Sequence, residues 1–341
     1  MADEGANARR SRSAAIDAVR VLGLTAVVAG HAFADPVVRS ALYPWHVPVF
    51  FFLTGYLWTS GRDLGTEIRK RSATLLRPYL AWLLLGGLLV LVVRLLTGRG
   101  VDPGMVGAML LGGTHIDSPL YTFWFVTALL FAALLYRLLE RLPIWARLAV
   151  PGAALAVTYA VPHVVAGIPL SVGVAVPSVL FLLAGTVARR YRPRIRHPLG
   201  SGLAAVAVAA LAVSTGASRP VDIKQGDFGT PVLSVAVAVL ASFGIVLIAE
   251  VVIPRLGNRI GAVVVALAAG GLLVMLVHPV VLWALGNDAD AGSWPLFLSA
   301  LAAPWALAVA LRHTALSPWV LGVPRATAPR DVRSGRSGSG S

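Results

Sequence analysis

The sequence predicts an all-α, polytopic integral membrane protein with about ten transmembrane helices and both termini in the cytoplasm. The chain has 341 residues, of which 57% are hydrophobic and only 13% are charged. A soluble domain is usually about half apolar and about a quarter charged. Apolar runs long enough to cross a bilayer recur along the chain, and the basic residues between them fall mainly in alternate loops. These observations argue against a soluble globular protein.

The apolar runs also divide the chain into segments. A basic cytoplasmic segment at 1–13 precedes a transmembrane domain at 14–316, and a disordered cytoplasmic tail is expected at 317–341 because that stretch is rich in proline, arginine, glycine and serine. No cleavable signal peptide is expected. In chain order, the predicted spans are 14–34, 43–60, 79–97, 121–139, 144–161, 168–188, 198–215, 231–253, 260–285 and 294–315.

The lysine and arginine positions predict the orientation. With the amino terminus inside, 23 of the 29 basic residues face the cytoplasm, whereas the outer loops carry mainly acids. The net charge of +14 therefore reflects topology and contact with anionic lipid headgroups, and no nucleic-acid partner is expected. The chain has no cysteine, so disulfides and thiolate catalysis are excluded. No metal site is predicted.

The first span carries polar side chains that are rare in membrane helices and usually have a functional role. Asp17, Arg20 and His31 interrupt an otherwise apolar run, and charged groups there cost a few kcal/mol each. Arg20 and His31 are eleven positions apart, which is three helical turns plus about 20°, and Asp17 precedes Arg20 by three. The three side chains therefore share one stripe, which is typical of the wall of a reaction channel.

Three later spans add polar and aromatic residues. The second begins with Tyr43-Pro44-Trp45-His46, the fourth with Tyr121-Thr122-Phe123-Trp124, and the ninth contains His278-Pro279. Odd spans run outward and even spans inward, so His31, His278, His46 and Trp124 are all expected in the outer third of the membrane. Arg20 is expected near the cytoplasm.

Each of these residues also has an ordinary structural interpretation. His46 could be an interfacial residue, and His278 could make a hydrogen bond to backbone that Pro279 disrupts. Asp17 and Arg20 could form an ion pair of no catalytic importance. These interpretations account poorly for His31 on the same stripe as that pair.

Several motifs resemble the acyltransferase-3 family of integral membrane O-acyltransferases. An arginine, ten residues and a histidine in the first helix are similar to the family's signature, here Arg20 and His31. Phe51-Phe52-Leu53-Thr54-Gly55-Tyr56 is similar to its aromatic-aromatic-x-x-Ser-Gly-aromatic element, with threonine in place of serine. The remaining matches are a basic loop with Arg71, Arg77 and Pro78, the Phe123-Trp124-Phe125 helix start, and Leu256-Gly257-Asn258 followed by Val277-His278-Pro279.

The resemblance implies transfer of an acyl group, often acetyl, from cytoplasmic acyl-CoA to a hydroxyl of a glycan, glycolipid or glycosylated metabolite. A hydroxyl needs a general base to attack a thioester, and histidine is the usual choice. His31 is therefore expected either to take the acceptor proton or to be acylated briefly itself. The family's loop often has two arginines three positions apart before the proline, but Thr74 stands at one of these positions here and Arg71 is the nearest substitute.

Roles are assigned on this basis. The expected catalytic residues are His31, Arg20, Asp17 and His278. Acyl-CoA, a co-substrate that is not permanently bound, is expected to contact Arg20, Arg71, Arg77 and Tyr56. The acceptor is expected to contact Trp124, His46 and Thr54, and Thr54 and Tyr56 are candidate oxyanion donors. The long outer loops 98–120 and 216–230 are expected to set acceptor specificity.

Two other functions stay open from the sequence. A proton-coupled transporter or exporter could use Asp17, Arg20 and His31 as a relay, although no interrupted helices are evident in the two halves of the chain. A non-catalytic membrane receptor or scaffold could use the same cavity. The alanine, valine, arginine and glycine bias suggests a high-GC bacterium, and the expected location is its cytoplasmic membrane. The oligomeric state is open.

Overall fold

The fold of the chain is all-helical, as the sequence predicts. The computed structural model describes residues 2–100, 102–286 and 292–326. Every regular element within these ranges is a helix, apart from an isolated bridge between Asp222 and Asp227. The helices are α1 (Ala2–Ala32), α2 (Pro36–Leu42), α3 (Pro48–Tyr56), α4 (Leu64–Arg71), α5 (Arg77–Leu96), α6 (Pro103–Leu111), α7 (Trp124–Leu139), α8 (Ile144–Ala160), α9 (Pro162–Ala166), α10 (Val172–Tyr191), α11 (Pro198–Ser214), α12 (Leu233–Arg255), α13 (Asn258–Ala269), α14 (Gly271–Ala284), α15 (Trp294–Arg312) and α16 (Ser317–Val320).

The lengths and apolar character of these helices are those of a multi-pass membrane protein. Among the described residues, five helical stretches are long and apolar enough to cross a bilayer, and the bent pair α13 and α14 makes a sixth if it is one span. Helices α7, α8 and α11 are apolar but shorter. Each of the ten predicted ranges contains a helix, whereas the count of ten crossings and the orientation stay predictions.

The ninth predicted span is broken in the middle, which the sequence analysis did not foresee. Helices α13 and α14 meet at an angle of 63° around Gly270 and Gly271. A side chain at Gly270 would meet Ala308 of α15, and one at Gly271 would meet Leu24 of α1. The two glycines therefore permit both the bend and close packing against two other helices.

The second predicted span is also shorter than the range 43–60. Residues 43–47 form turns, and α3 covers only nine residues from Pro48. Proline favours the first turn of a helix because it lacks an N–H, so Pro48 marks the start of α3. The turn before it holds Tyr43 and His46 outside regular helix, at one side of the site described below.

Close backbone contacts hold α3 in the centre of the helix bundle. A Cβ at Gly55 would collide with the carbonyl of Leu182, and one at Gly185 would collide with the carbonyl of Phe52. Small residues allow such approach between membrane helices, where dispersion contacts replace the hydrophobic effect. Thus α10 lies directly against α3, and both lie beside α7.

The start of the carboxyl-terminal tail is ordered, contrary to the expectation of disorder from residue 317. Helix α16 packs on α5, where the indole Nε1 of Trp82 donates a hydrogen bond to the carbonyl of Val320 at 2.8 Å. Ser317, Val320 and Leu321 are all buried. The tail residues 327–341 lie outside the described part of the chain.

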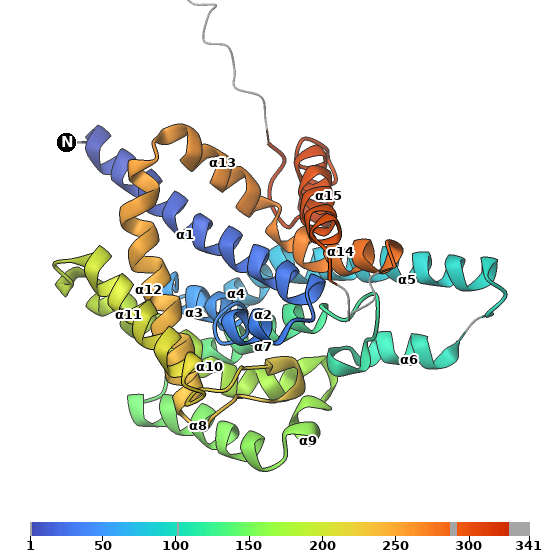
Figure 1. Ribbon diagram of the computed structural model, residues 1–341, viewed down its shortest axis with the longest axis horizontal. Helices are drawn as coiled ribbons and strands as arrows, with labels where there is room; N and C mark the ends of the chain where they lie inside the picture. The colour runs from blue at the N-terminus through green and yellow to red at the C-terminus, as the bar shows by residue number, and fades with distance from the viewer. Residues whose placement is uncertain (1, 101, 287–291, 327–341) are drawn as a thin grey trace, which may run out of the picture.

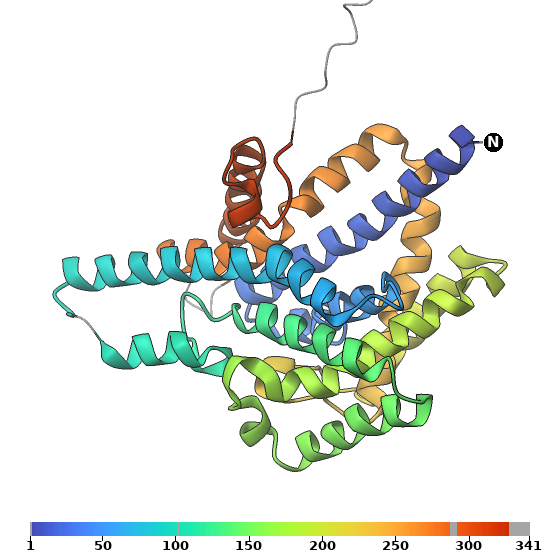
Figure 2. The same cartoon turned by 180° about the vertical axis from the view of Figure 1, so that it is seen from behind.

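Helices α5 and α6 extend away from the rest of the bundle as an arm (Figure 1). The view from behind shows the same arrangement, with α14 alongside the inner part of α5 (Figure 2). Many leucines of α5 are exposed, including Leu84, Leu85, Leu88 and Leu89. Because this helix is apolar and largely uncovered by protein, lipid is its natural surrounding.

Candidate functional site

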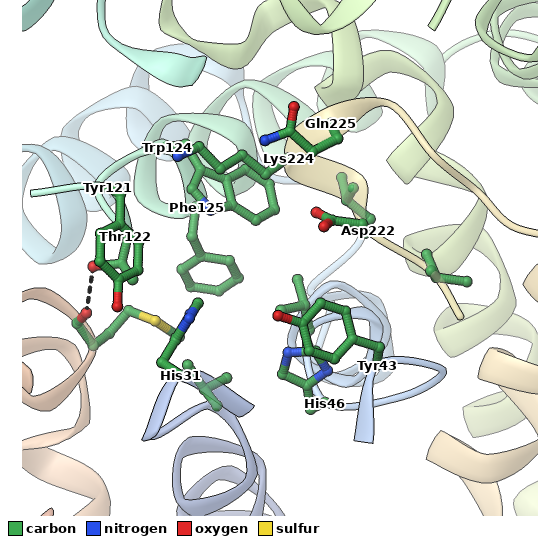
Figure 3. A pocket seen from close by; sticks show the side chains of 15 residues that line it. His31, Tyr43, His46, Tyr121, Thr122, Trp124, Phe125, Asp222, Lys224 and Gln225 are labelled. Carbon is green, nitrogen blue, oxygen red and sulfur yellow. Dashed lines mark hydrogen bonds between the residues drawn. The ribbon is translucent and has the colours of Figure 1, made fainter. Parts of the chain in front are cut away.

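A cavity of about 230 Å³ lies where the end of α1 meets the start of α7 and the loop before α12. We call it the histidine cavity. Its polar and aromatic lining consists of His31, Tyr43, His46, Tyr121, Thr122, Trp124, Phe125, Asp222, Lys224 and Gln225 (Figure 3). With Met275 of α14, the lining residues come from five separate parts of the sequence, so only the folded chain creates the site.

His31 lies in the last turn of α1 and contacts two other rings. Its imidazole packs edge-on against Tyr121, with 4.9 Å between ring centroids, and stacks on His278 at 5.4 Å. His278, from α14, is fully buried behind it. The structure thus brings together the first-helix histidine and the ninth-span histidine.

The tautomer of His278 follows from its hydrogen bond. Its Nδ1 lies 2.8 Å from the carbonyl of Val274, and a carbonyl only accepts, so Nδ1 carries the proton. The other nitrogen, Nε2, is buried and has no hydrogen-bond partner among the described residues. In the neutral ring this nitrogen has a lone pair that can accept a proton. The carbonyl freed by Pro279 is that of Met275, and it accepts from the Thr122 hydroxyl at 2.8 Å.

His46 shows the same pattern on another wall of the cavity. Its Nδ1 lies 2.8 Å from the carbonyl of Leu42, so Nδ1 donates and Nε2 holds the lone pair. The ring packs against Tyr43 at 4.7 Å between centroids, and the guanidinium of Arg39 lies 4.2 Å above the Tyr43 ring. Figure 3 shows Tyr43 and His46 together on one side of the cavity.

The start of α7 supplies a further wall. Tyr121 and Thr122 lie in the turn before the helix, and Trp124 and Phe125 are its first residues. Trp124, which the sequence analysis placed beside the histidines, lines the same cavity. The bond from Thr122 to the carbonyl of Met275 joins this wall to α14.

The loop before α12 covers the cavity with charged and polar groups. Asp222 pairs with Arg39 at 3.3 Å, and the Lys224 ammonium lies 5.6 Å from the centroid of Tyr121. Burial lowers the pKa of Lys224, and the negative charges of Asp117 and Asp222 oppose this effect. The loop 216–230, which is predicted to face outward and to set acceptor specificity, therefore contributes Asp222, Lys224 and Gln225 to the lining.

Asp17 and Arg20 lie away from the histidine cavity. They form an ion pair at 2.7 Å on the same helix, and the Arg20 side chain is 42% exposed. Eleven residues of helix separate Arg20 from His31, which is about 16 Å along the axis. The polar stripe of α1 therefore connects the cavity with a distant ion pair.

Arg71, an expected acyl-CoA contact, belongs to a buried ion cluster. Glu67 is 1% exposed and pairs with Arg71 at 2.8 Å, with Arg62 at 3.0 Å and with Arg137 at 3.2 Å. Arg137 also pairs with Glu140 and lies 4.1 Å over the Trp58 ring. We call Arg62, Glu67, Arg71, Arg137 and Glu140 the Glu67 cluster. The Arg71 guanidinium thus already pairs with a buried carboxylate, that of Glu67. An arginine that binds the phosphates of acyl-CoA would instead need a guanidinium without such a partner.

Three further residues that were expected to contact the donor or the acceptor, Arg77, Tyr56 and Thr54, also lie outside the histidine cavity, whereas His46 and Trp124 line it. Arg77 is exposed, with its guanidinium 5.4 Å from the centroid of Trp319 in α16. The Tyr56 hydroxyl donates to Glu250 at 2.9 Å, and the Thr54 hydroxyl donates to the carbonyl of Phe50 at 2.9 Å. Neither Tyr56 nor Thr54 is placed to stabilise an oxyanion beside His31.

Sequence reasoning did not single out several residues of the two polar regions. Tyr43 and Tyr121 each belong to an aromatic stretch of the sequence, which gives them no distinct signal there. Lys224 is one of four basic residues in the loops that are predicted to face outward, which is a signal that the sequence contains. Glu67 and Arg137 gave no signal, because their pairing joins residues 70 positions apart.

The arrangement provides proton acceptors beside a cavity. Neutral imidazoles can accept a proton from a hydroxyl, and phenol, hydroxyl and ammonium groups around them can donate hydrogen bonds to developing negative charge. Within the described ranges, no group of three His, Cys, Asp or Glu side chains is arranged to hold a metal ion. The site suits acid–base chemistry on an acceptor with a hydroxyl.

Comparison with known proteins agrees with this assignment of chemistry. A family model described as an acyltransferase domain matches residues 13–313, which include every helix from α1 to α15 except the first turns of α1. No curated protein and no solved structure matches the chain. Because the match covers most of the sequence, the chain belongs to the acyltransferase-3 family.

Proposed function

We propose that this protein is a membrane O-acyltransferase that moves an acyl group, most simply acetyl, from cytoplasmic acyl-CoA to a hydroxyl of a glycan, glycolipid or glycosylated metabolite. The observation that carries this proposal is the pair of stacked imidazoles, His31 and His278, at a cavity with three further walls of polar and aromatic groups. The family match supports an acyltransferase in general.

The proposed reaction needs one proton acceptor and one activated carbonyl. An imidazole nitrogen of His31 takes the proton of the acceptor hydroxyl as its oxygen attacks the thioester carbon. A carbon–oxygen bond forms, the carbon–sulfur bond breaks, and the proton passes to the departing thiolate to give free CoA. In a second route, His31 attacks first and passes the acyl group on. Both routes require the imidazole of His31.

The donor has to reach His31 from the cytoplasm under this proposal. The pantetheine arm would run beside α1 past Arg20, over about 16 Å of helix. The exposure of Arg20 supports a contact with the arm or a phosphate. Arg77 is the better candidate for the nucleotide phosphates, because it has no carboxylate partner among the described residues.

The decisive experiment is acyl transfer by the purified protein. Radiolabelled acetyl-CoA is incubated with the protein in nanodiscs, with thiol release and label on candidate glycosides as the readouts. Release that depends on both protein and acceptor is the expected result. A transporter would instead move substrate into liposomes without releasing thiol. The helix break at Gly270 is a feature that transporters also use, which makes this comparison worthwhile.

The proposed orientation has its own test. With both termini in the cytoplasm, residue 190 is inside and residue 102 outside, in a bacterial cytoplasmic membrane. The chain has no cysteine, so Arg190→Cys and Asp102→Cys each give a single thiol. An impermeant thiol reagent added to intact cells is expected to label only the variant at 102. Labelling at 190 would contradict the orientation.

A further inference from the structure

An apolar groove of about 240 Å³ lies between α5, the start of α7 and α14. Its floor includes Leu120, Phe123 and Val280, and its rim includes Leu85 and Leu89 of α5. Those two leucines are 51% and 42% exposed. The groove therefore opens sideways onto the lipid-facing surface of α5, which makes a hydrocarbon chain its natural occupant.

A second cavity, of about 310 Å³, continues from the groove along α5, and we call it the polar cavity because charged groups stand in its lining beside apolar residues such as Val90 and Met109. It contains Arg94, Asp102, His115 and Asp117, and it shares Leu120 with the groove. Along α5 the two spaces extend from Trp82 to Arg94, which is about 18 Å of helix. The order is apolar first and polar second, as in an amphiphile with one tail and one head.

The charges of the polar cavity favour a neutral head. The lining holds one guanidinium, that of Arg94, and two carboxylates, those of Asp102 and Asp117, and Arg94 lies 4.0 Å from Asp102. An anionic phospholipid head would meet more negative than positive charge. Sugar hydroxyls can donate to the carboxylates and accept from the guanidinium, so a glycosyl head satisfies both.

The groove and the histidine cavity are separated by a thin wall. Leu120 and Phe123 line the groove, whereas Tyr121 and Thr122 line the histidine cavity. On α14, Leu276 likewise faces the groove and Met275 the histidine cavity. The sugar head would cross this wall at its rim, where Asp117 of the polar cavity acts electrostatically on Lys224 of the histidine cavity.

We propose that the groove and the polar cavity bind a neutral, sugar-headed amphiphile, with its tail against α5 and α14 and its head reaching over the rim toward His31. The amphiphile is the acceptor, an assignment that rests on the function proposed above. Holding the tail in the groove raises the local concentration of the acceptor hydroxyl at His31.

The first test measures binding without turnover. The full chain in nanodiscs is irradiated with dodecyl maltoside that carries a diazirine in its tail, and the labelled peptides are mapped. We expect saturable labelling around Leu85, Leu89 and Val280 that unlabelled dodecyl maltoside displaces. Leu89→Trp fills the groove and should abolish this labelling, whereas Leu88→Trp, at a neighbouring exposed leucine outside the groove, should retain it.

The second test measures transfer to methyl maltoside and to dodecyl maltoside. The dodecyl acceptor should have a KM lower by about tenfold or more, since burial of methylene groups is favourable. Leu89→Trp should remove this preference, so that the two acceptors have similar KM values, whereas Leu88→Trp should keep the wild-type difference between them and the wild-type melting temperature. Saturable labelling without turnover on either acceptor would support the amphiphile site and contradict the proposed function.

Three results would overturn the inference. Labelling that does not saturate, or that is equal in the Leu88→Trp and Leu89→Trp proteins, would show bulk lipid contact only. Stronger labelling by a diazirine phosphatidylglycerol would assign the site to an anionic lipid. Labelled peptides from a second copy of the chain at the groove would assign it to self-association.

Discussion

The two ends of α7 hold polar groups in opposite ways. At its start, Trp124 lines the histidine cavity, where imidazoles and phenols face open space. Near its end, about 20 Å away along the helix, Arg137 belongs to the Glu67 cluster, where each charged side chain has an oppositely charged partner within 4 Å. A buried charge needs such an oppositely charged partner for stability. Among the described residues, each end also leaves one buried nitrogen without a hydrogen-bond partner, Nε2 of His278 and Nε of Arg137, and each has a cost. The imidazole nitrogen has a lone pair that can accept a proton and the guanidinium nitrogen has none, so the two ends differ in the chemistry that they allow.

The largest expected effect is on catalysis at the histidine cavity, beside the start of α7. His31→Ala should lower acyl transfer by about 10²–10⁴-fold, because both proposed routes need this imidazole. The melting temperature should change little if the residue serves chemistry rather than packing. His278→Ala, which removes the stacked ring behind it, is the control and should lose less activity. A His31→Ala protein that keeps at least about a tenth of the wild-type turnover would remove His31 from the mechanism.

The second expected effect is on stability at the other end. Glu67→Ala leaves three arginines without their shared carboxylate and should cost about 3–5 kcal/mol in the free energy of unfolding. Thermal unfolding in detergent would measure it. Asp63→Ala is the matched control, since Asp63 caps α4 at Thr66 but is exposed to solvent. If Glu67→Ala lowers the stability by no more than Asp63→Ala does, the Glu67 cluster does not hold α4 to α7.

The third expected effect separates two arginines that the sequence could not tell apart. Arg77→Ala should raise the KM for acyl-CoA, by a factor equivalent to about 1–3 kcal/mol of lost binding free energy. The reason is that the exposed guanidinium of Arg77 can reach the phosphates of the coenzyme. Arg71→Ala should mainly lower the melting temperature, because Arg71 is paired with Glu67. Arg69→Ala, on the exposed side of α4, should do neither. An unchanged KM in the Arg77→Ala enzyme would move the donor site elsewhere.

The smallest expected effect is a pH dependence at the cover of the cavity. Burial lowers the pKa of Lys224 in the folded protein, so the unfolded chain binds its proton more readily. At pH values below the folded-state pKa of Lys224, holding the charged ammonium in the folded protein therefore lowers the free energy of unfolding. This loss of stability becomes smaller as the pH rises toward the usual pKa of lysine. Lys224→Met should be slightly more stable than wild type at neutral pH, with the difference shrinking toward pH 10. A melting-temperature difference that is constant with pH would contradict a buried Lys224.

The sequence predicted much of the arrangement around the histidine cavity at the start of α7. It predicted little of the Glu67 cluster near the end of that helix. Helical periodicity and the alternating direction of the predicted spans were enough to predict that His31, His46, His278 and Trp124 lie near one another. Both of these signals depend only on local patterns in the sequence. The pairing of Glu67 with Arg137 depends on how α4 packs against α7, which no local pattern encodes. The break at Gly270 was missed for the same reason, since the glycines act through contacts with Ala308 and Leu24.

Helix α16 has a practical meaning for work with this protein. It places Trp319 over Arg77 and fastens Val320 to Trp82, so the beginning of the tail is part of the same unit as the loop that we expect to meet the coenzyme. A shortened gene that stops at residue 316 would remove both attachments. Affinity tags and fluorescent fusions are better joined after residue 326, where they leave this corner of the molecule intact.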